Sequence, residues 1–239
     1  MKENESASGQ DTGTQDKQDP TGINPELVEA VEGSKIDIGD KVNLLLVGAG
    51  MKPASNFELL VRSGENVFLG KGDLEKIKSI MNESGLVFEV HEIENDIESK
   101  MQILFGRSRE ELERLAEIVK NLPNPKQVES GEYSKDQMRE IYLAQGAAYG
   151  YPQSAIEAFV GKGGGERLNV GDLPAEIRES DAFIFSVFAL SKDNWQEEIK
   201  QGKAWADYIK SVSPGIYREM MEKSRKTRGL RIKINKEGR

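Results

Sequence analysis

Residues 86–93 read LVFEVHEI and residues 100–105 read KMQILF. The first segment alternates apolar and polar side chains after its first residues, which is typical of a half-buried strand. The second segment is a short, mainly apolar run of strand length. The other elements of the N-terminal half are placed relative to these two predicted strands.

Apolar patterns and turn residues upstream of these strands predict further elements. Ser63-Gly64 is typical of a hairpin turn, and Asp73 is a candidate N-cap of a helix that ends at Gly85. The predicted elements are a helix over Pro25–Val31, a buried strand over Lys41–Val47, a hairpin of Phe57–Val61 with Val67–Leu69, and a helix over Leu74–Asn82.

A capping box follows the two central strands. Ser108 is followed three residues later by Glu111, and this spacing predicts a helix that runs to about Asn121. The predicted order is therefore strand, hairpin, helix, strand, strand, helix. It indicates an α+β fold with a mainly antiparallel sheet and helices on one face.

The segment Leu122–Gly131 (LPNPKQVESG) predicts a domain boundary, because it combines two prolines with charged residues. It separates an α+β domain, 25–122, from a mostly helical C-terminal domain, 132–239, with one buried strand. The elements predicted beyond it are helices from Ser134 to Ala148, from Pro152 to Phe159, from Ser191 onward and from Pro214 to about Lys226, a buried strand over Ala182–Leu190 and an edge strand over Leu230–Ile234.

The N-terminal residues 1–24 carry few large apolar side chains, so we expect a disordered tail. No apolar run approaches the about 20 residues of a membrane helix, and no secretory signal is visible. We therefore expect a cytoplasmic protein that does not bind membranes.

Charge is distributed unevenly along the chain. The net charge is −8, but residues 223–239 hold eight basic residues and one acid, so the remaining 222 residues carry −15. The acidic body disfavours general nucleic-acid binding, whereas the basic tail is a candidate for RNA contact or for pairing with an acidic partner.

The composition excludes several chemistries within this chain. It has no cysteine and one histidine, which excludes disulfides, thiolate metal sites, iron–sulfur clusters, cysteine nucleophiles and multi-histidine metal sites. His91 shares a predicted strand face with Glu89, so we expect it on a polar face. We expect no metal and no cofactor.

Two glycine-rich segments invite a phosphate-binding interpretation. Gly48-Ala49-Gly50 follows a predicted strand, but Pro53 stands where a dinucleotide fingerprint needs glycine, so a tight turn is expected. Lys162-Gly163-Gly164-Gly165 lacks P-loop spacing and predicts a mobile loop, with anion binding or a lid as alternatives. Trp195, Trp205 and Tyr208 lie along a predicted helix face and are expected in the core.

Two C-terminal segments together resemble a known family. Residues 150–159 read GYPQSAIEAF and residues 185–202 read FSVFALSKDNWQEEIKQG. The pair resembles the archaeal family called domain of unknown function 483, in which a glycine-tyrosine-proline corner precedes two cysteines and a second segment carries histidine, proline and cysteines. The resemblance covers about residues 135–225.

This chain departs from that pattern at the positions of the family's cysteines, histidine and proline. Ser154 and Ala155 stand at the cysteine positions, and Val187, Ala189, Leu190 and Asn194 stand at the histidine, proline and cysteine positions. The resemblance therefore implies a member that has lost a metal or thiolate centre and has kept the corner as structure.

The leading functional hypothesis is a non-catalytic module that binds an anionic small molecule or a protein partner. Its predicted site lies between the 150–159 corner, the 161–167 loop and the start of the long helix, with Ser154, Lys162, Arg167 and Asn194 as polar candidates. The alternatives are a metal-independent enzyme acting on a phosphorylated small molecule, with Lys162 and Arg167 as an anion clamp, and RNA binding through residues 223–239.

Overall fold

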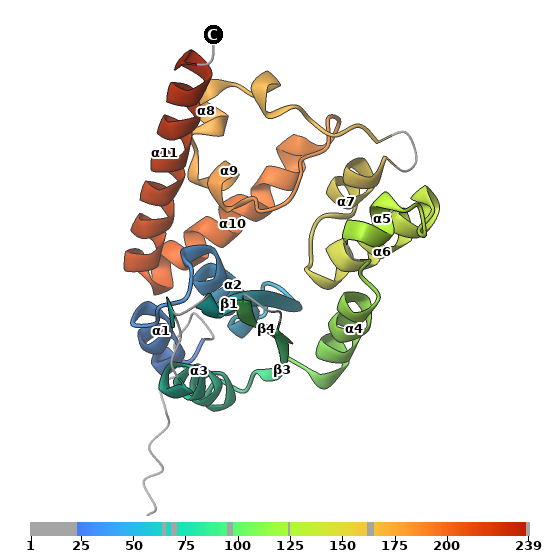
Figure 1. Ribbon diagram of the computed structural model, residues 1–239. Helices are drawn as coiled ribbons and strands as arrows, with labels where there is room; N and C mark the ends of the chain where they lie inside the picture. The colour runs from blue at the N-terminus through green and yellow to red at the C-terminus, as the bar shows by residue number, and fades with distance from the viewer. Residues whose placement is uncertain are drawn as a thin grey trace, which may run out of the picture.

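An antiparallel sheet lies in the lower part of the molecule as Figure 1 shows it, with helices above and below. The computed structural model describes residues 23–63, 66–67, 71–94, 98–123, 125–161 and 165–237. The sheet has the order β2-β1-β4-β3. Its strands are β1 (Ala54–Ser63), β2 (Asn66–Val67), β3 (Val87–Glu94) and β4 (Glu98–Gly106).

The register of the sheet confirms the predicted strands. β3 pairs with β4 from Val87 opposite Gly106 to Glu94 opposite Ser99. β1 pairs antiparallel with β4 and with the two-residue β2, so the hairpin prediction is confirmed. Gly64 of the predicted turn and residues 68–69 of the predicted second strand lie outside the described residues.

Helices cover both faces of the sheet, so the prediction of one covered face was wrong. Ile103, Leu104 and Phe105 of β4 are all 0% exposed. Successive side chains of a strand point to opposite faces, so three consecutive buried residues require cover on both sides. Ile103 and Phe105 belong to a cluster with residues of α1 (Pro25–Glu32), α2 (Ile38–Gly48) and α3 (Lys71–Glu83), whereas Leu104 packs with residues of α4 (Arg109–Lys120).

The segment 41–47 is part of helix α2, so the predicted buried strand was wrong. Asp37 caps the helix by accepting the backbone N–H of Gly39 at 2.9 Å. Leu44, Leu45, Leu46 and Val47 are each at most 1% exposed. A helix that is buried on all sides has no amphipathic period, and its short apolar run is indistinguishable from a buried strand.

Helices make up the described C-terminal half. They are α5 (Pro125–Glu129), α6 (Lys135–Ala148), α7 (Gln153–Val160), the 3-10 turn Val170–Asp172, α8 (Ala175–Arg178), α9 (Asp181–Phe185), α10 (Trp195–Val212) and α11 (Pro214–Glu237). The α+β fold with a mostly helical C-terminal part is confirmed. Among the described residues, no helix combines the length and the apolar character needed to cross a bilayer.

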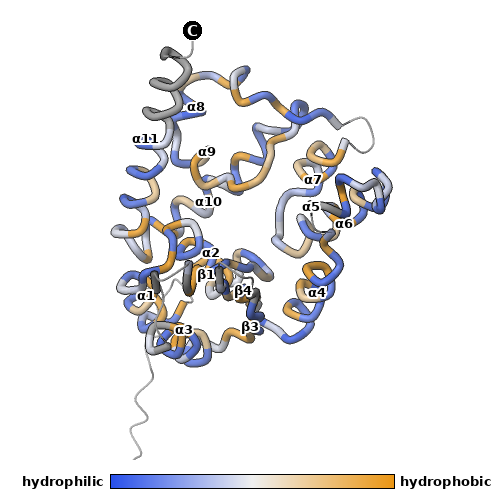
Figure 2. The backbone as a smooth tube through the Cα atoms, in the orientation of Figure 1, coloured by the Kyte–Doolittle hydropathy of each residue, from blue (hydrophilic) through white to orange (hydrophobic). Residues whose placement is uncertain are grey.

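Both strands predicted in this half were wrong. Residues 182–185 belong to α9, which Ser180 caps, and residues 230–234 continue α11. Figure 2 shows how apolar α9 is. Its first turn is fixed by the Ser180 hydroxyl, which accepts the N–H of Phe183 at 3.2 Å, and this local cap outweighs the β-propensity of the run.

The predicted helix starts agree best with the structure where a side chain caps the helix. The capping boxes at Ser108 and Ser134 are both present, and Asn24 caps α1. Two predicted starts were wrong: Asp73 lies inside α3, and α10 begins at Trp195 rather than at Ser191. Most of the predicted tail lies outside the described residues, but Ile23, at its end, is buried.

The largest cluster of buried apolar residues draws on both predicted domains. Leu45 of α2 and Phe57 of β1 belong to the same cluster as Phe185 of α9 and Trp205 and Ile209 of α10. Residues from both sides of the predicted boundary at 122–131 therefore share one core. The division into two domains stays a prediction.

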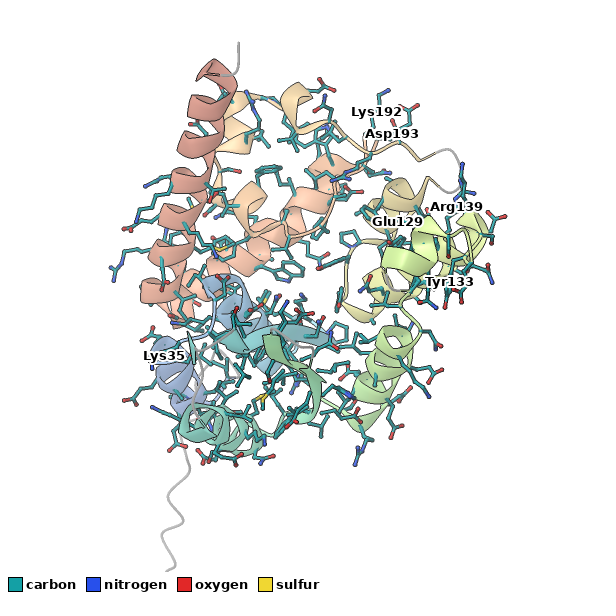
Figure 3. The ribbon with its side chains drawn as sticks, in the orientation of Figure 1. Lys35, Glu129, Tyr133, Arg139, Lys192 and Asp193 are labelled. Carbon is teal, nitrogen blue, oxygen red and sulfur yellow. The ribbon has the colours of Figure 1, made fainter. Side chains whose placement is uncertain are left out.

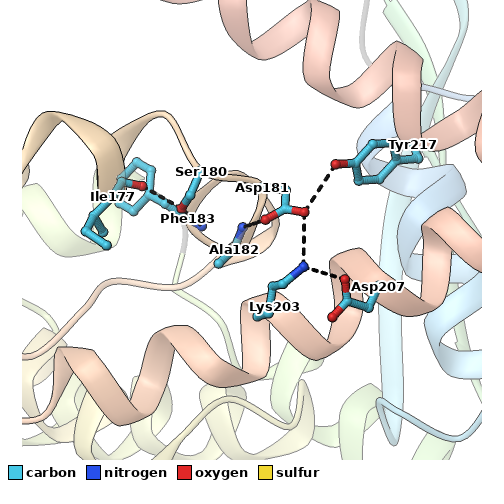
Figure 4. A network of polar contacts seen from close by, with 8 residues as sticks. All are labelled: Ile177, Ser180, Asp181, Ala182, Phe183, Lys203, Asp207 and Tyr217. Atoms are coloured by element: carbon cyan, nitrogen blue, oxygen red, sulfur yellow. Dashed lines mark hydrogen bonds and ion pairs between the residues drawn. The ribbon is translucent and has the colours of Figure 1, made fainter.

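Polar contacts tie α9, α10 and α11 together above this core (Figure 4). One oxygen of Asp181 accepts from the amine of Lys203 at 3.4 Å and from the hydroxyl of Tyr217 at 3.2 Å. Lys203 also pairs with Asp207 one turn further along α10. The Asp181 carboxylate thus joins side chains from three helices.

A close approach of backbones underlies this arrangement. At Gly202 of α10, an added Cβ would lie 2.1 Å from the hydroxyl of Ser186 and 2.2 Å from the carbonyl oxygen of Ala182. Only glycine allows α9 to cross α10 at this distance.

Gly202→Ala should therefore lower the free energy of unfolding by about 3 kcal/mol, because the added methyl group overlaps backbone that cannot rotate away. Urea unfolding measures this loss. Gly72→Ala is the matched control, since nothing lies within 4 Å of its Cβ position in α3. It should change the free energy by less than about 1 kcal/mol. Equal effects of the two variants would contradict the close approach.

Candidate functional site

The Tyr149-Gly150-Tyr151-Pro152 corner connects α6 to α7 and lies against the turn that follows α2. Gly150 has a φ of +70°, and an added Cβ would lie 2.7 Å from the ring of Pro53. Gln201 of α10 donates to the Gly150 carbonyl oxygen at 2.8 Å. Contacts from both halves therefore fix the corner, and with it the directions of its two tyrosines.

Lys52 lies in the cage that this arrangement creates. Its amine is 5.3 Å from the centre of the Tyr151 ring, 5.7 Å from that of Tyr149 and 5.6 Å from that of Trp205. It donates to the side-chain oxygen of Asn43 in α2 at 2.7 Å. Lys52 is 1% exposed. We call these four partners the Lys52 cage.

The cage has no acidic member. No carboxylate among the described residues forms an ion pair with Lys52. Burial lowers the pKa of the Lys52 amine to about 7, because the charged form loses its hydration. The three ring faces and the Asn43 oxygen favour the ammonium form and oppose this effect. Burial also raises the pKa of the Tyr149 and Tyr151 hydroxyls.

A cavity of about 190 Å³ lies beside the cage. Tyr149 and Tyr151 belong to both, so the same two rings face the Lys52 amine and line the cavity. The cavity lies between α6, α7 and the segment that follows α9. Its other lining residues are Tyr142, Gln145, Gly146, Ala155, Ile156, Phe159, Val187, Phe188 and Ala189.

Two of the polar groups of the cavity, on Gln145 and Tyr149, form hydrogen bonds within the protein. Gln145 donates to the Tyr149 hydroxyl at 3.3 Å, and that hydroxyl donates to Asn56 of β1. The Tyr142 and Phe159 rings meet edge to face, 5.6 Å apart. The cavity is therefore suited to an apolar or aromatic group.

A second hollow of about 410 Å³ adjoins the cavity and shares Phe159, Val187, Phe188 and Ala189 with it. Phe159 is 48% exposed and Val187 is 42% exposed. The guanidinium of Arg167 lies 5.6 Å from the centre of the Phe159 ring. An exposed cation thus borders the apolar opening.

Of the four polar candidates predicted from the sequence, the three that the structure describes do not line one cavity. Arg167 borders the hollow, but Ser154 faces away and donates to Glu198 of α10 at 2.6 Å. Asn194 is exposed and precedes α10 without a side-chain cap bond. Lys162 lies outside the described residues.

The contact between Ser154 and Glu198 places the 150–159 corner next to the start of α10, as the sequence predicts. Glu198 is 3% exposed. Its oxygens also accept the hydroxyl of Ser191 at 2.5 Å and the Ser191 N–H at 2.7 Å. With three donors, this buried carboxylate is satisfied and joins α7 to α10 as a structural element.

The surface outside this network is charged. Lys192 pairs with Glu166 at 2.7 Å, beside the exposed Asp193 (Figure 3). Arg139 of α6 donates to the carbonyl oxygen of Val160 at 3.1 Å and thereby joins the C-terminal end of α7 to α6. These exposed contacts surround the cavity but do not line it.

The remaining sequence candidates have local roles. His91 is exposed and lies 3.4 Å from Glu89 on the same strand face, as expected. Gly48-Ala49-Gly50 forms the turn that ends α2, which confirms the tight-turn prediction. Trp205 is 1% exposed, as expected of a core residue. No group of three acidic or histidine side chains gathers within the part of the chain that the structure describes.

Sequence reasoning missed Lys52 and Asn43. One signal was present, since Lys52 is the only charged residue between Lys41 and Glu58 in an otherwise apolar and small-residue stretch. The rings that surround it come from positions far along the chain, and no pattern in a single sequence brings them together.

Comparisons with protein-family models, curated proteins and solved structures found no match for this chain. The resemblance of residues 150–159 and 185–202 to the archaeal family therefore stays a prediction.

The pKa of Lys52 leads to a pH-dependent stability. The unfolded chain binds a proton at this amine up to about pH 10.5, whereas the folded chain releases it near pH 7. Between these values the unfolded state holds more protons, so the free energy of unfolding should rise with pH by about 1.4 kcal/mol per pH unit from this group. Urea unfolding of the wild type and of Lys52→Met isolates the contribution as the difference of slopes. Parallel slopes would contradict it.

Proposed function

We propose that the protein is a non-catalytic binding module for a small molecule with an apolar, aromatic-sized body and an anionic group. The supporting observation is the ring-lined cavity together with the exposed Arg167 guanidinium, which contacts the Phe159 ring of the cavity lining. The cavity would take the body of the ligand, and Arg167 would pair with its anionic end.

The volume of the cavity supports this ligand size. An apolar cavity of about 150 Å³ accepts benzene, and this cavity is about 190 Å³. Tyr142, Tyr149 and Phe188 offer ring faces and edges to an aromatic guest. A strongly polar body would lose hydration without recovering hydrogen bonds, because the Gln145 and Tyr149 groups already contact each other.

The charge of Arg167 supports an anionic end. Among the described residues, no carboxylate forms an ion pair with its guanidinium, whereas Lys192 and Arg139 both have acidic partners. A guanidinium stacked on an exposed ring keeps its donor edges free for a carboxylate.

No specific feature favours the two alternative functions over this one. For the enzyme alternative, the buried carboxylate nearest the corner is Glu198, whose oxygens already accept from Ser154 and Ser191. For RNA binding, the backbone of residues 223–237 belongs to α11, but the side chains beyond Thr227 lie outside the described ones. Both stay predictions, as does the cytoplasmic location.

Benzoate should stabilise the protein saturably in thermal unfolding, and benzyl alcohol should stabilise it less, because only benzoate pairs with Arg167. Arg167→Gln should weaken benzoate binding about fivefold, the value of one exposed ion pair, and leave benzyl alcohol unchanged. Phe159→Ala should weaken both ligands about tenfold by removing one ring contact.

Arg109→Gln is the matched control, since Arg109 is an exposed arginine of α4 outside the cavity lining. It should bind both ligands as the wild type does. Absence of saturable stabilisation by benzoate, benzyl alcohol and related aromatic acids would overturn the proposed function.

A further inference from the structure

The amine of Lys52 lies directly behind the wall of the cavity. The Tyr149 and Tyr151 rings separate the two, with ring centres 5.7 and 5.3 Å from the nitrogen. On its other sides the amine meets Trp205 and Asn43. The cavity and the amine therefore share these two rings.

A purely structural role does not explain this amine. A buried cation costs free energy unless a charged partner compensates for its lost hydration, and an apolar side chain of the same length would fill the space at lower cost. Lys41, the other buried lysine among the described residues, instead donates to the Glu32 carbonyl oxygen at the C-terminal end of α1. Lys52 thus has the surroundings of a nucleophilic lysine, which is activated by desolvation in an apolar pocket.

We propose that Lys52 is a covalent site for aldehydes, which it binds as an imine when an aromatic or branched apolar aldehyde enters the cavity. This inference rests on the proposed function, because the aldehyde reaches Lys52 through the same cavity. Rotation of the Tyr151 ring away from the amine, into space that the cavity provides, opens the path.

The reaction balances without an oxidant or a reductant. The lone pair of the neutral Lys52 nitrogen attacks the aldehyde carbon, and the carbonyl oxygen takes up a proton to give a carbinolamine. Loss of its hydroxyl as water, with the proton from nitrogen, leaves the C=N double bond. One amine and one aldehyde give one imine and one water.

The protonation state of Lys52 favours the first step. With a pKa of about 7, about half of the amine is neutral at pH 7. An ordinary lysine with a pKa near 10.5 is neutral about a thousand times less often. This difference makes Lys52 distinguishable from surface lysines in a labelling experiment.

The test uses the full chain with benzaldehyde and sodium cyanoborohydride near pH 7, which converts any imine to a stable benzylamine that peptide mass mapping locates. Labelling of Lys52 should be at least about tenfold faster than that of any other lysine. Saturating benzoate, which competes for the cavity, should slow it by at least about tenfold. Because the readout is taken on the wild type, it does not depend on whether a variant folds.

Two variants confirm the assignment. Lys52→Met should abolish the rapid label, and Lys41→Met, which removes the other buried lysine, should leave it unchanged. Labelling of Lys52 at the rate of surface lysines would overturn the inference, while stabilisation by benzoate in the same sample would leave the proposed function intact. Rapid labelling of Lys52 that benzoate does not slow would overturn the route through the cavity.

Discussion

The amine of Lys52 meets side chains from three distant parts of the chain. Asn43 comes from α2, Tyr149 and Tyr151 from the corner between α6 and α7, and Trp205 from α10. The three ring faces attract the ammonium form of Lys52. Together with the Gln201 bond to Gly150 and the close approach of Gly150 to Pro53, the Lys52 cage holds the corner, and hence this wall of the cavity, in place.

Different contacts hold the opposite wall of the cavity in place. Val187, Phe188 and Ala189 follow the short helix α9 and lie in no regular element. This segment is held at its ends, by the crossing of α9 over Gly202 and by the donors that Ser191 gives to Glu198. The cavity therefore lies between a corner fixed by helix contacts and rings and an irregular segment anchored at both ends.

Local signals in the sequence predicted elements well where a side chain itself forms the decisive bond. The caps at Asn24, Ser108 and Ser134 are of this kind. The prediction at 41–47 was wrong because tertiary contacts bury this segment, and burial on all sides removes the period that separates helix from strand. The prediction at 182–190 was wrong for another reason: Ser180 caps a short helix there, and the residues that follow it form no regular element. The corner beside the cavity and Arg167 beside the adjoining hollow were both predicted from the sequence, whereas Ser154 turns to a buried acid that no spacing rule reveals.

Two buried ionisable groups near the corner differ in the number of hydrogen bonds they form. This difference separates a structural group from one that can react. Glu198 receives two hydroxyl groups and one backbone N–H, which leaves it little capacity for a reaction. Lys52 gives one hydrogen bond to Asn43 and meets only ring faces elsewhere, so a neutral amine there loses little. The Lys52 amine can change its protonation state at small cost, and only one ring separates it from an apolar cavity. Covalent capture of a ligand at this amine therefore needs little rearrangement of the protein.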